Sequence, residues 1–352
     1  MISVVCLLDK GSRFPLMVAE GLVDHPGVLP FFNKPVQSLG RRIAAATAFE
    51  PLCSRMLGCD LIFLPDPEHF GLTEYLDFIE SRDLFGKVVV YDFKDSPHLD
   101  RVLLERCKAY FKRSFLTGPE RRPLPAASRP VRPFNYGVLN AYVEVARPLD
   151  GDRPIDLGYY FDPAVVAADR RRGKVLGGLA GADWSGLEVR IGQVTADGAR
   201  GRQGVMAAPA GNPWVAFMRL LSRTKIVFNA FPEGWDGDSR TWEAMSSGAL
   251  CFLDVSGIPT PRYFEDGVHC FFYDAADERS IRDAVRKARE MLAPSRREER
   301  ERIAARGVRH ALSFHRSVHR VDQVLQAVRA EDAGQAACAS EPGRPAAQGS
   351  FT

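Results

Sequence analysis

Short apolar runs alternate with longer stretches of helical periodicity in the first part of the chain. Apolar runs rich in β-branched residues occupy residues 2–8, 60–66 and 87–93. The stretches at 37–56 and 73–84 lie between these runs and have the spacing of helices. Because this alternation is typical of βα units, it predicts a parallel sheet.

Proline and arginine then interrupt the pattern. Residues 109–116 predict one more strand with its outgoing loop, and the sequence GPERRPLPAASRPVRPFNYG follows at 118–137. Dense proline and charge are unfavourable for regular structure. We therefore expect this segment to join two lobes.

The same alternation restarts beyond this linker. Strands are predicted at 155–162, 187–194, 225–231, 248–255 and 269–274, with helices at 164–181, at 213–224 and from Ser239 onward. From Glu278 to Ala330 the pattern is helical, with interruptions expected near Pro294 and around Gly307. The second half therefore repeats the architecture of the first.

The whole pattern predicts an α/β fold with two lobes in tandem. The first domain covers residues 1–135, and the second covers 136–330 with the closing helices. Residues 331–352 lack a core-forming pattern, so we expect a disordered tail.

The composition narrows the class of protein. At 352 residues, the chain can bury two cores of ordinary size. Hydrophobic residues at 45% and charged residues at 26% match a soluble globular protein. A net charge of +3 is too small for a dedicated nucleic-acid binder, so no nucleic-acid partner is expected.

The cysteines and the first residues favour a cytoplasmic protein. Seven cysteines are scattered without the spacing of a zinc site, which indicates reduced thiols. The opening MISVVCLLDKGSR has no basic region before its apolar run and no cleavage site after it, so it predicts a first strand. The apolar runs are also too short to span a bilayer.

The segment KIVFNAFPEGWDGDSRTWEAM, residues 225–245, has the layout of an anion-binding strand, loop and helix. The strand ends near Ala230, a glycine-rich loop follows, and Asp238 or Ser239 caps a helix with Arg240 in its first turn. Unpaired N–H groups at a helix N-terminus favour a phosphate. The segment therefore predicts an anion site.

Glu243 lies one turn deeper in the same helix. Its carboxylate can accept paired hydrogen bonds from a ribose diol, and Ser246, Ser247 and Gly248 let the chain turn tightly into the next strand. This combination favours a nucleotide-diphosphate cradle. The alternative is purely structural, because the helix dipole favours an early glutamate and serine-glycine pairs commonly end helices.

Residues 155–328 resemble the GT-B glycosyltransferases, in particular their group 1 and spore-maturation-protein-like (CgeB-like) branch. The resemblance rests on Arg240, Glu243, Ala244, Ser247 and Gly248 before the apolar strand 249–253, and on the segments LSRTKIVFN, FEDGVHCFFYDAADERSIRDAV and RIAARGVRHALSFHRSVHRVDQVL. It implies that Glu243 holds the donor ribose and that basic residues with helix N-terminal amides hold the diphosphate. It also implies two tandem Rossmann-like domains that face each other across a cleft, the GT-B type, with the acceptor site in the first lobe.

Two further basic residues are candidates for the diphosphate. Arg172 lies in the basic run that follows the first strand of the second lobe, and Lys225 precedes the strand IVFN. Arginine pairs well with phosphate oxygens, although a solvated helix face explains such residues equally well. With these, the predicted donor-binding residues are Asp238, Ser239, Arg240, Glu243, Gly248, Arg172 and Lys225.

We expect no metal requirement and no cofactor besides the donor. The Asp-Gly-Asp sequence at 236–238 invites a metal interpretation, because another large transferase fold uses an Asp-x-Asp pair to hold a divalent cation. Here the aspartates lie in a glycine-rich loop that opens a helix. Turn formation and capping therefore explain them better.

A catalytic base would come from the first lobe if the transfer inverts stereochemistry, and a retaining enzyme would need none. Asp92, Asp95 and His98 follow one predicted strand, and the segment LPDPEHF places Asp66, Glu68 and His69 after another. Asp95 and His98 are the candidate base, although loop acids of this kind commonly form turns and caps. The sequence leaves inversion and retention open.

The leading hypothesis is a metal-independent glycosyltransferase that moves a sugar from a nucleotide-diphosphate sugar to a saccharide, lipid-linked glycan or other hydroxyl acceptor. A nucleotide-sugar epimerase or hydrolase, or an inactive binding module, remains an alternative. A dinucleotide oxidoreductase is disfavoured because no GxGxxG follows an early strand. The arginine-rich segment 295–320 leaves peripheral membrane association open, and the sequence does not predict an oligomeric state.

Overall fold

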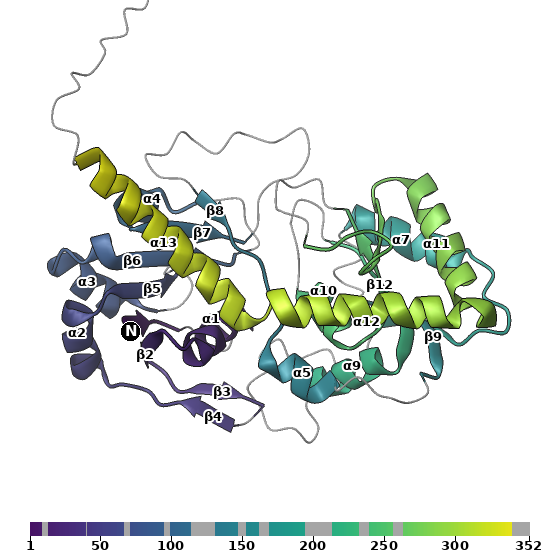
Figure 1. The fold of residues 1–352 in the computed structure, drawn as a ribbon, viewed down its shortest axis with the longest axis horizontal. Helices are drawn as coiled ribbons and strands as arrows, with labels where there is room; N and C mark the ends of the chain where they lie inside the picture. Colours follow the sequence, from purple (N-terminus) through teal and green to yellow (C-terminus); the bar gives the residue numbers. More distant parts are fainter. Residues whose placement is uncertain are drawn as a thin grey trace, which may run out of the picture.

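A computed structural model describes most of the chain. The described residues are 1–8, 13–39, 41–66, 71–94, 99–113, 131–146, 153–161, 169–193, 213–231, 239–255 and 263–339. They form two α/β lobes that lie side by side along the long axis of the molecule (Figure 1). Each lobe is built around one parallel sheet.

The first lobe contains a six-stranded sheet. In spatial order its strands are β2 (Val28–Phe32), β1 (Ile2–Cys6), β5 (Leu61–Pro65), β6 (Val88–Asp92), β7 (Ala109–Lys112) and β8 (Val131–Pro133). The central strands β5 and β6 are buried along their whole length. Continuous apolar runs are what a parallel sheet covered on both faces requires.

Helices and a short hairpin complete the first lobe. Its helices are α1 (Arg13–Asp24), α2 (Phe49–Gly58), α3 (Thr73–Ser81) and α4 (Arg101–Arg106), with a 3-10 turn at Phe85–Lys87. The antiparallel pair β3 (Val36–Ser38) and β4 (Arg41–Ala44) lies outside the main sheet.

The second lobe contains a five-stranded sheet. In spatial order its strands are β10 (Val189–Gln193), β9 (Ile155–Phe161), β11 (Thr224–Asn229), β12 (Leu250–Asp254) and β13 (Phe271–Tyr273), and all neighbours are parallel. Alternate residues of its central strands enter different cores. Phe228 belongs to the core under the helices on one face, and Val227 belongs to the core on the other.

Two groups of helices cover this second sheet. The first group is α7 (Arg170–Ala180) and α11 (Glu278–Leu292), which pack against each other. The second group is α5 (Asn140–Ala146), α9 (Pro213–Ser222) and α10 (Ser239–Ser246), with α12 (Arg297–Phe314) packed on α10 and β12. A 3-10 turn at Pro294–Arg296 separates α11 from α12.

The chain crosses between the lobes twice, and the crossings are hydrogen-bonded to each other. The backbone N–H of Val138 donates to the carbonyl of His315 at 2.8 Å, and that of Ser317 donates to the carbonyl of Val138 at 3.1 Å. The first crossing leads into α5. The second leads into α13 (Ser317–Ala339), which returns to pack against α1 (Figure 1).

The predicted α/β architecture of two Rossmann-like domains is confirmed, with differences that have local causes. Residues 37–56 do not form the single predicted helix. The first part of this stretch belongs to β3 and β4, and only the last part belongs to α2. The strand β2 was not predicted, since Pro30 interrupts its apolar run. As β2 lies at the edge of the sheet, its proline needs no partner on the open side.

The C-terminal part also differs from the predicted division of the chain. Helix α12 continues through Gly307, and the break lies at His315 instead. Helix α13 continues past Ala330, where Glu331 bonds with Arg132 at 2.7 Å and Asp332 pairs with Lys108 of the first lobe. The last helix therefore packs with the first lobe. Residues 340–352 of the predicted tail lie outside the described part.

Within the described residues, none of the helices combines the length and apolar character needed to cross a membrane.

Candidate functional site

The second sheet reverses its strand order between β9 and β11. From β9 the chain continues to β10 on one side of the sheet and then returns to β11 on the other side. In open α/β sheets, ligands bind outside the carboxyl ends of the strands at such a reversal. The carboxyl ends of β9 and β11 therefore define the candidate site.

Two arginines form hydrogen bonds across this reversal, each from the helix that follows one strand to the backbone at the end of the other strand. Arg240, in the first turn of α10, donates from Nη1 to the carbonyl of Tyr160 near the end of β9 at 2.9 Å. Arg172, in the first turn of α7, donates from Nε to the carbonyl of Ala230 just past β11 at 3.1 Å. Two guanidinium groups from different helices are thus brought to one edge of the sheet.

The helix that carries Arg172 has its own cap. Asp169 accepts from the backbone N–H groups of Arg171 and Arg172 at 3.0 and 3.1 Å, an interaction typical of helix N-termini. Burial raises the pKa of the Tyr159 hydroxyl, and the charges of Arg172 and Arg240 oppose this shift. Both arginines therefore act on the same buried phenol.

Glu243 lies in the second turn of α10, and its side chain is fully buried. Its Oε1 accepts a hydrogen bond from Nε1 of Trp214 at 2.9 Å. Trp214 lies at the start of α9, and its ring packs against Tyr142 of α5 with centroids 5.4 Å apart. Sequence reasoning missed Trp214, because a tryptophan at the start of an apolar helix is usually a core residue.

A second buried carboxylate ties together the ends of three strands. Asp254, the last residue of β12, accepts from the backbone N–H of Ala275 at 2.9 Å and of Phe231 at 3.3 Å. Arg171 reaches it at 3.4 Å. Burial raises the pKa of the Asp254 carboxyl to about 6, against the opposing effect of Arg171. Asp254 therefore holds together the loops at the carboxyl ends of these strands. Sequence reasoning missed it, although an aspartate at the end of a buried apolar strand is a signal for such a residue.

Two predicted donor-binding residues lie at the other edge of the sheet. Lys225 is the second residue of β11, and its Nζ pairs with Asp156 at the start of β9 at 2.6 Å. Gly248 follows α10 with a φ of 79°, and its N–H donates to the carbonyl of Met245. Gly248 thus ends the helix, as its left-handed conformation allows. Strand and helix direction thus place both residues away from the carboxyl ends, so neither lies at the candidate site.

The other predicted positions in the second lobe are Ser239 and Asp238. Ser239 is the first residue of α10 and is half-buried. Asp238 lies outside the described residues, together with the rest of the Asp-Gly-Asp segment. Among the side chains that are described, no group of three or more His, Cys, Asp or Glu could hold a metal ion.

The carboxyl edge of the first sheet carries buried ion pairs. Asp92 is paired with Lys112 at 2.9 Å and accepts from the hydroxyl of Tyr110 at 2.8 Å. Asp66 is paired with Lys94 at 2.5 Å. Burial lowers the pKa of the Lys112 ammonium, and Asp92 opposes this shift. Asp92 and Asp66 are therefore held in ion pairs within the lobe.

The candidate base falls outside this description. Asp95 and His98, together with Glu68 and His69, belong to segments beyond the described residues. Their role remains a prediction.

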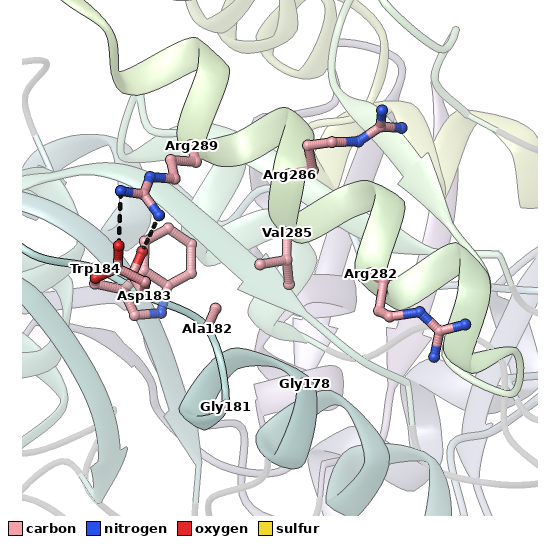
Figure 2. A pocket seen from close by; sticks show the side chains of 9 residues that line it. All are labelled: Gly178, Gly181, Ala182, Asp183, Trp184, Arg282, Val285, Arg286 and Arg289. Carbon is pink, nitrogen blue, oxygen red and sulfur yellow. Dashed lines mark hydrogen bonds and ion pairs between the residues drawn. The ribbon is translucent and has the colours of Figure 1, made fainter.

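A cavity of about 320 Å³ lies elsewhere, between α7 and α11 (Figure 2). Arg282, Arg286 and Arg289 of α11 line it beside Trp184. Arg289 bonds with Asp183 at 3.1 Å, whereas the guanidinium groups of Arg282 and Arg286 point away from that pair (Figure 2). Because the three charges diverge, this cavity does not resemble a built anion site.

Comparison with known proteins gives a family match for the second lobe. Residues 170–326 match the model of the family described as glycosyl transferase-like. No curated protein is similar enough in sequence to count as a relative.

Solved structures are similar over nearly the whole chain, at low sequence identity. An alpha-glucosyltransferase in complex with UDP and a 13-mer DNA has 10% identity and a TM-score of 0.58, covering 93% of this chain and 99% of its own. A trehalose-6-phosphate structure from E. coli, bound with UDP-2-fluoro glucose, has 10% identity and a TM-score of 0.53, covering 93% and 98%. A sucrose-phosphate synthase from Thermosynechococcus elongatus has 12% identity and a TM-score of 0.54, covering 95% and 100%. At such identity these matches show the fold, which is the GT-B arrangement.

Proposed function

We propose that the protein is a glycosyltransferase that uses a nucleotide-diphosphate sugar as donor and a hydroxyl group as acceptor. The observation that carries this proposal is the reciprocal bonding of Arg172 and Arg240 across the β9/β11 reversal. It brings two permanent positive charges to the place where α/β sheets bind ligands. The family match over 170–326 and the GT-B fold support the same class of reaction.

The two arginines and the start of α10 are assigned to the diphosphate. Guanidinium groups form paired hydrogen bonds with phosphate oxygens, and the first N–H groups of a helix favour an anion. Ser239 and Asp238 flank that helix start, which makes them further donor contacts in this proposal. When the sugar leaves the donor, negative charge grows on the diphosphate. Fixed positive groups there lower the barrier for transfer.

Glu243 is assigned to the ribose. It lies deeper in α10 than Arg240, and helical side chains lean toward the helix N-terminus, which is the end at the site. A carboxylate there accepts hydrogen bonds from a diol and would select a ribonucleotide. The acceptor side belongs to the first lobe, with Asp95 and His98 as the proposed base if the transfer inverts stereochemistry.

The proposal predicts that Glu243→Gln weakens nucleotide binding while the protein stays folded. Glutamine keeps the volume of the side chain and an oxygen for Trp214, but it removes the charge that strengthens hydrogen bonds from the ribose hydroxyls. We expect a loss in affinity of about tenfold or more. The measurement is a thermal-shift screen with the diphosphates of uridine, guanosine, adenosine and thymidine, because a ligand of the native state raises the melting temperature.

Lys225→Met is the matched control for that screen. Lys225 lies in the same lobe but at the opposite edge of the sheet, so its removal should leave nucleotide affinity unchanged. The assigned site would be contradicted if no nucleotide raised the melting temperature of the wild type. An equal loss of nucleotide affinity in Glu243→Gln and Lys225→Met would contradict it as well.

Turnover separates the proposed transferase from its alternatives. An epimerase or hydrolase would consume a nucleotide sugar without an acceptor, and an inactive module would bind the nucleotide sugar and never convert it. A glycosyltransferase releases nucleoside diphosphate in proportion to an added acceptor. A panel of saccharide and lipid-linked acceptors, assayed for diphosphate release, distinguishes these outcomes.

A further inference from the structure

The hydrogen bond between Trp214 and Glu243 joins two helices that both begin at the candidate site. Trp214 is the second residue of α9, which follows β10, and Glu243 lies in the second turn of α10, which follows β11. Each helix therefore starts at the carboxyl edge of the sheet. The indole Nε1 donates to Oε1 of the carboxylate at 2.9 Å, and both side chains are buried.

The indole is itself held in place by a third helix. Its ring packs on Tyr142 of α5 with centroids 5.4 Å apart and an angle of 35° between the ring planes. Both aromatic residues belong to the core cluster shared by the two lobes. A tryptophan has only two side-chain torsions, so a packed indole presents its N–H in one fixed direction.

This arrangement matters because a buried carboxylate is costly to hold in a defined orientation. Glu243 has three side-chain torsions, and its burial removes the water that would otherwise solvate the charge. A neutral N–H donor at one oxygen fixes the plane of the carboxylate without cancelling its charge. The hydrogen bond from Trp214 thus gives the carboxyl group a fixed direction.

We propose that Trp214 is a positioning residue for donor binding, acting through Glu243 so that the carboxylate meets both hydroxyls of a donor ribose. This inference rests on the proposed function and adds to it a preference for one class of nucleotide. The site should prefer ribonucleoside diphosphates over diphosphates that lack the 2′- and 3′-hydroxyls. Trp214 should matter for that preference and not for the binding of the diphosphate.

The test compares UDP with 2′,3′-dideoxyuridine diphosphate by isothermal titration calorimetry, and if the thermal-shift screen identifies another base, the corresponding pair of diphosphates of that base replaces them throughout. For the wild type we expect UDP to bind about tenfold or more tightly than the dideoxy compound. For Trp214→Phe, which keeps an aromatic ring against Tyr142 and removes the N–H, we expect this ratio to fall to about threefold or less. Affinity for the dideoxy compound should stay the same.

A second tryptophan supplies the matched control. Trp184 also donates its indole N–H, in this case to the carbonyl of Leu179 at 2.8 Å, and it lies beside the cavity of Figure 2 away from the reversal. Trp184→Phe should therefore keep the wild-type preference for UDP. A purely structural loss of an indole hydrogen bond would affect both variants alike.

The outcomes separate this inference from the function on which it rests. If the wild type binds neither compound, the proposed donor site fails and the inference fails with it. If the wild type prefers UDP and Trp214→Phe keeps the same preference, the inference alone is wrong. If the preference is lost in Trp214→Phe and kept in Trp184→Phe, the positioning role is supported.

A measurement on the unmodified protein covers the case in which Trp214→Phe does not fold. The chain has four tryptophans, so its indole N–H resonances are few enough to resolve by NMR. A Trp214 resonance that shifts with UDP and not with the dideoxy compound supports the proposal. Equal shifts with both compounds, or none with either, overturn it.

Discussion

Gly307 lies in the middle of α12, where the absence of a side chain lets the helix approach its neighbours closely. A Cβ atom at this position would lie 2.4 Å from the carbonyl oxygen of His269 and 2.6 Å from Sδ of Met245. Both distances are shorter than van der Waals contact allows. The glycine is therefore needed for packing, which sequence alone cannot show, because a helix break and a close approach select the same residue.

Substitutions at two helical glycines should therefore have opposite effects on stability. Gly307→Ala should lower the free energy of unfolding by about 1–3 kcal/mol, since backbone and sulfur must move to admit the methyl group. Gly177→Ala in α7 should raise it by about 0.5–1 kcal/mol, because no atom lies within 4 Å of its Cβ position and alanine favours the helix. Urea denaturation measures both. A neutral Gly307→Ala would show that α12 can shift.

At the scale of elements, one buried carboxylate joins both crossings between the lobes. Glu20 of α1 accepts from the hydroxyl of Ser38 at 2.9 Å, the backbone N–H of Asn140 at 2.9 Å and the hydroxyl of Ser317 at 3.4 Å. Asn140 begins α5 and Ser317 begins α13. Glu20 therefore fixes the starts of both helices that leave the crossings.

The stability of this junction should depend on pH. Burial raises the pKa of the Glu20 carboxyl to about 7, with hydrogen bonds from Asn140 and Ser38 opposing the shift. The folded protein then holds a proton that the unfolded chain releases near pH 4.5, so stability falls as pH rises from about 4.5 to 7 and is level above that. The full effect is on the order of 3 kcal/mol.

Glu20→Gln is the variant that tests this pH dependence. A neutral amide cannot titrate, so urea denaturation of the variant at pH 5 and pH 8 should differ less than that of the wild type. We expect the variant to gain stability relative to wild type at pH 8. An unchanged difference between the two pH values would assign the titration to another group, such as Asp254, whose pKa is raised to about 6.

The elements with long apolar runs could be predicted from sequence, and those with short or interrupted runs could not. The strands β5 and β6 are buried along their length, so their sequences carry a strong signal. The strands β3 and β4 are too short to show a clear apolar pattern, and among the described strands they pair only with each other. The strand β2 contains a proline that only its edge position permits.

Positions in the candidate site could be predicted where the direction of a strand decides at which edge of the sheet a residue lies. Arg240 and Glu243 follow a strand, so they lie at its carboxyl end as predicted. Lys225 is near the start of the same strand, so the direction of the strand places Lys225 at the opposite edge of the sheet. Trp214 could not be found, because only the packing of α9 on α10 shows that its N–H meets a carboxylate.

At the scale of the whole molecule, we expect the proposed reaction to need no divalent cation for the donor diphosphate. In this proposal Arg172 and Arg240, which bond to backbone carbonyls at the candidate site, provide the positive charge that a metal ion provides in other transferases. We expect the transferase rate to be unchanged by EDTA. Loss of activity in EDTA, with recovery on adding Mn²⁺, would contradict this prediction.

The return of α13 to the first lobe has a consequence for the order in which the protein is made. Helix α13 packs on α1, yet it is translated after every element of the second lobe. Domains usually fold as they leave the ribosome, beginning with the N-terminal one. Here the first lobe must wait for its last helix, so the lobe that is synthesised first should be the last to reach its final state.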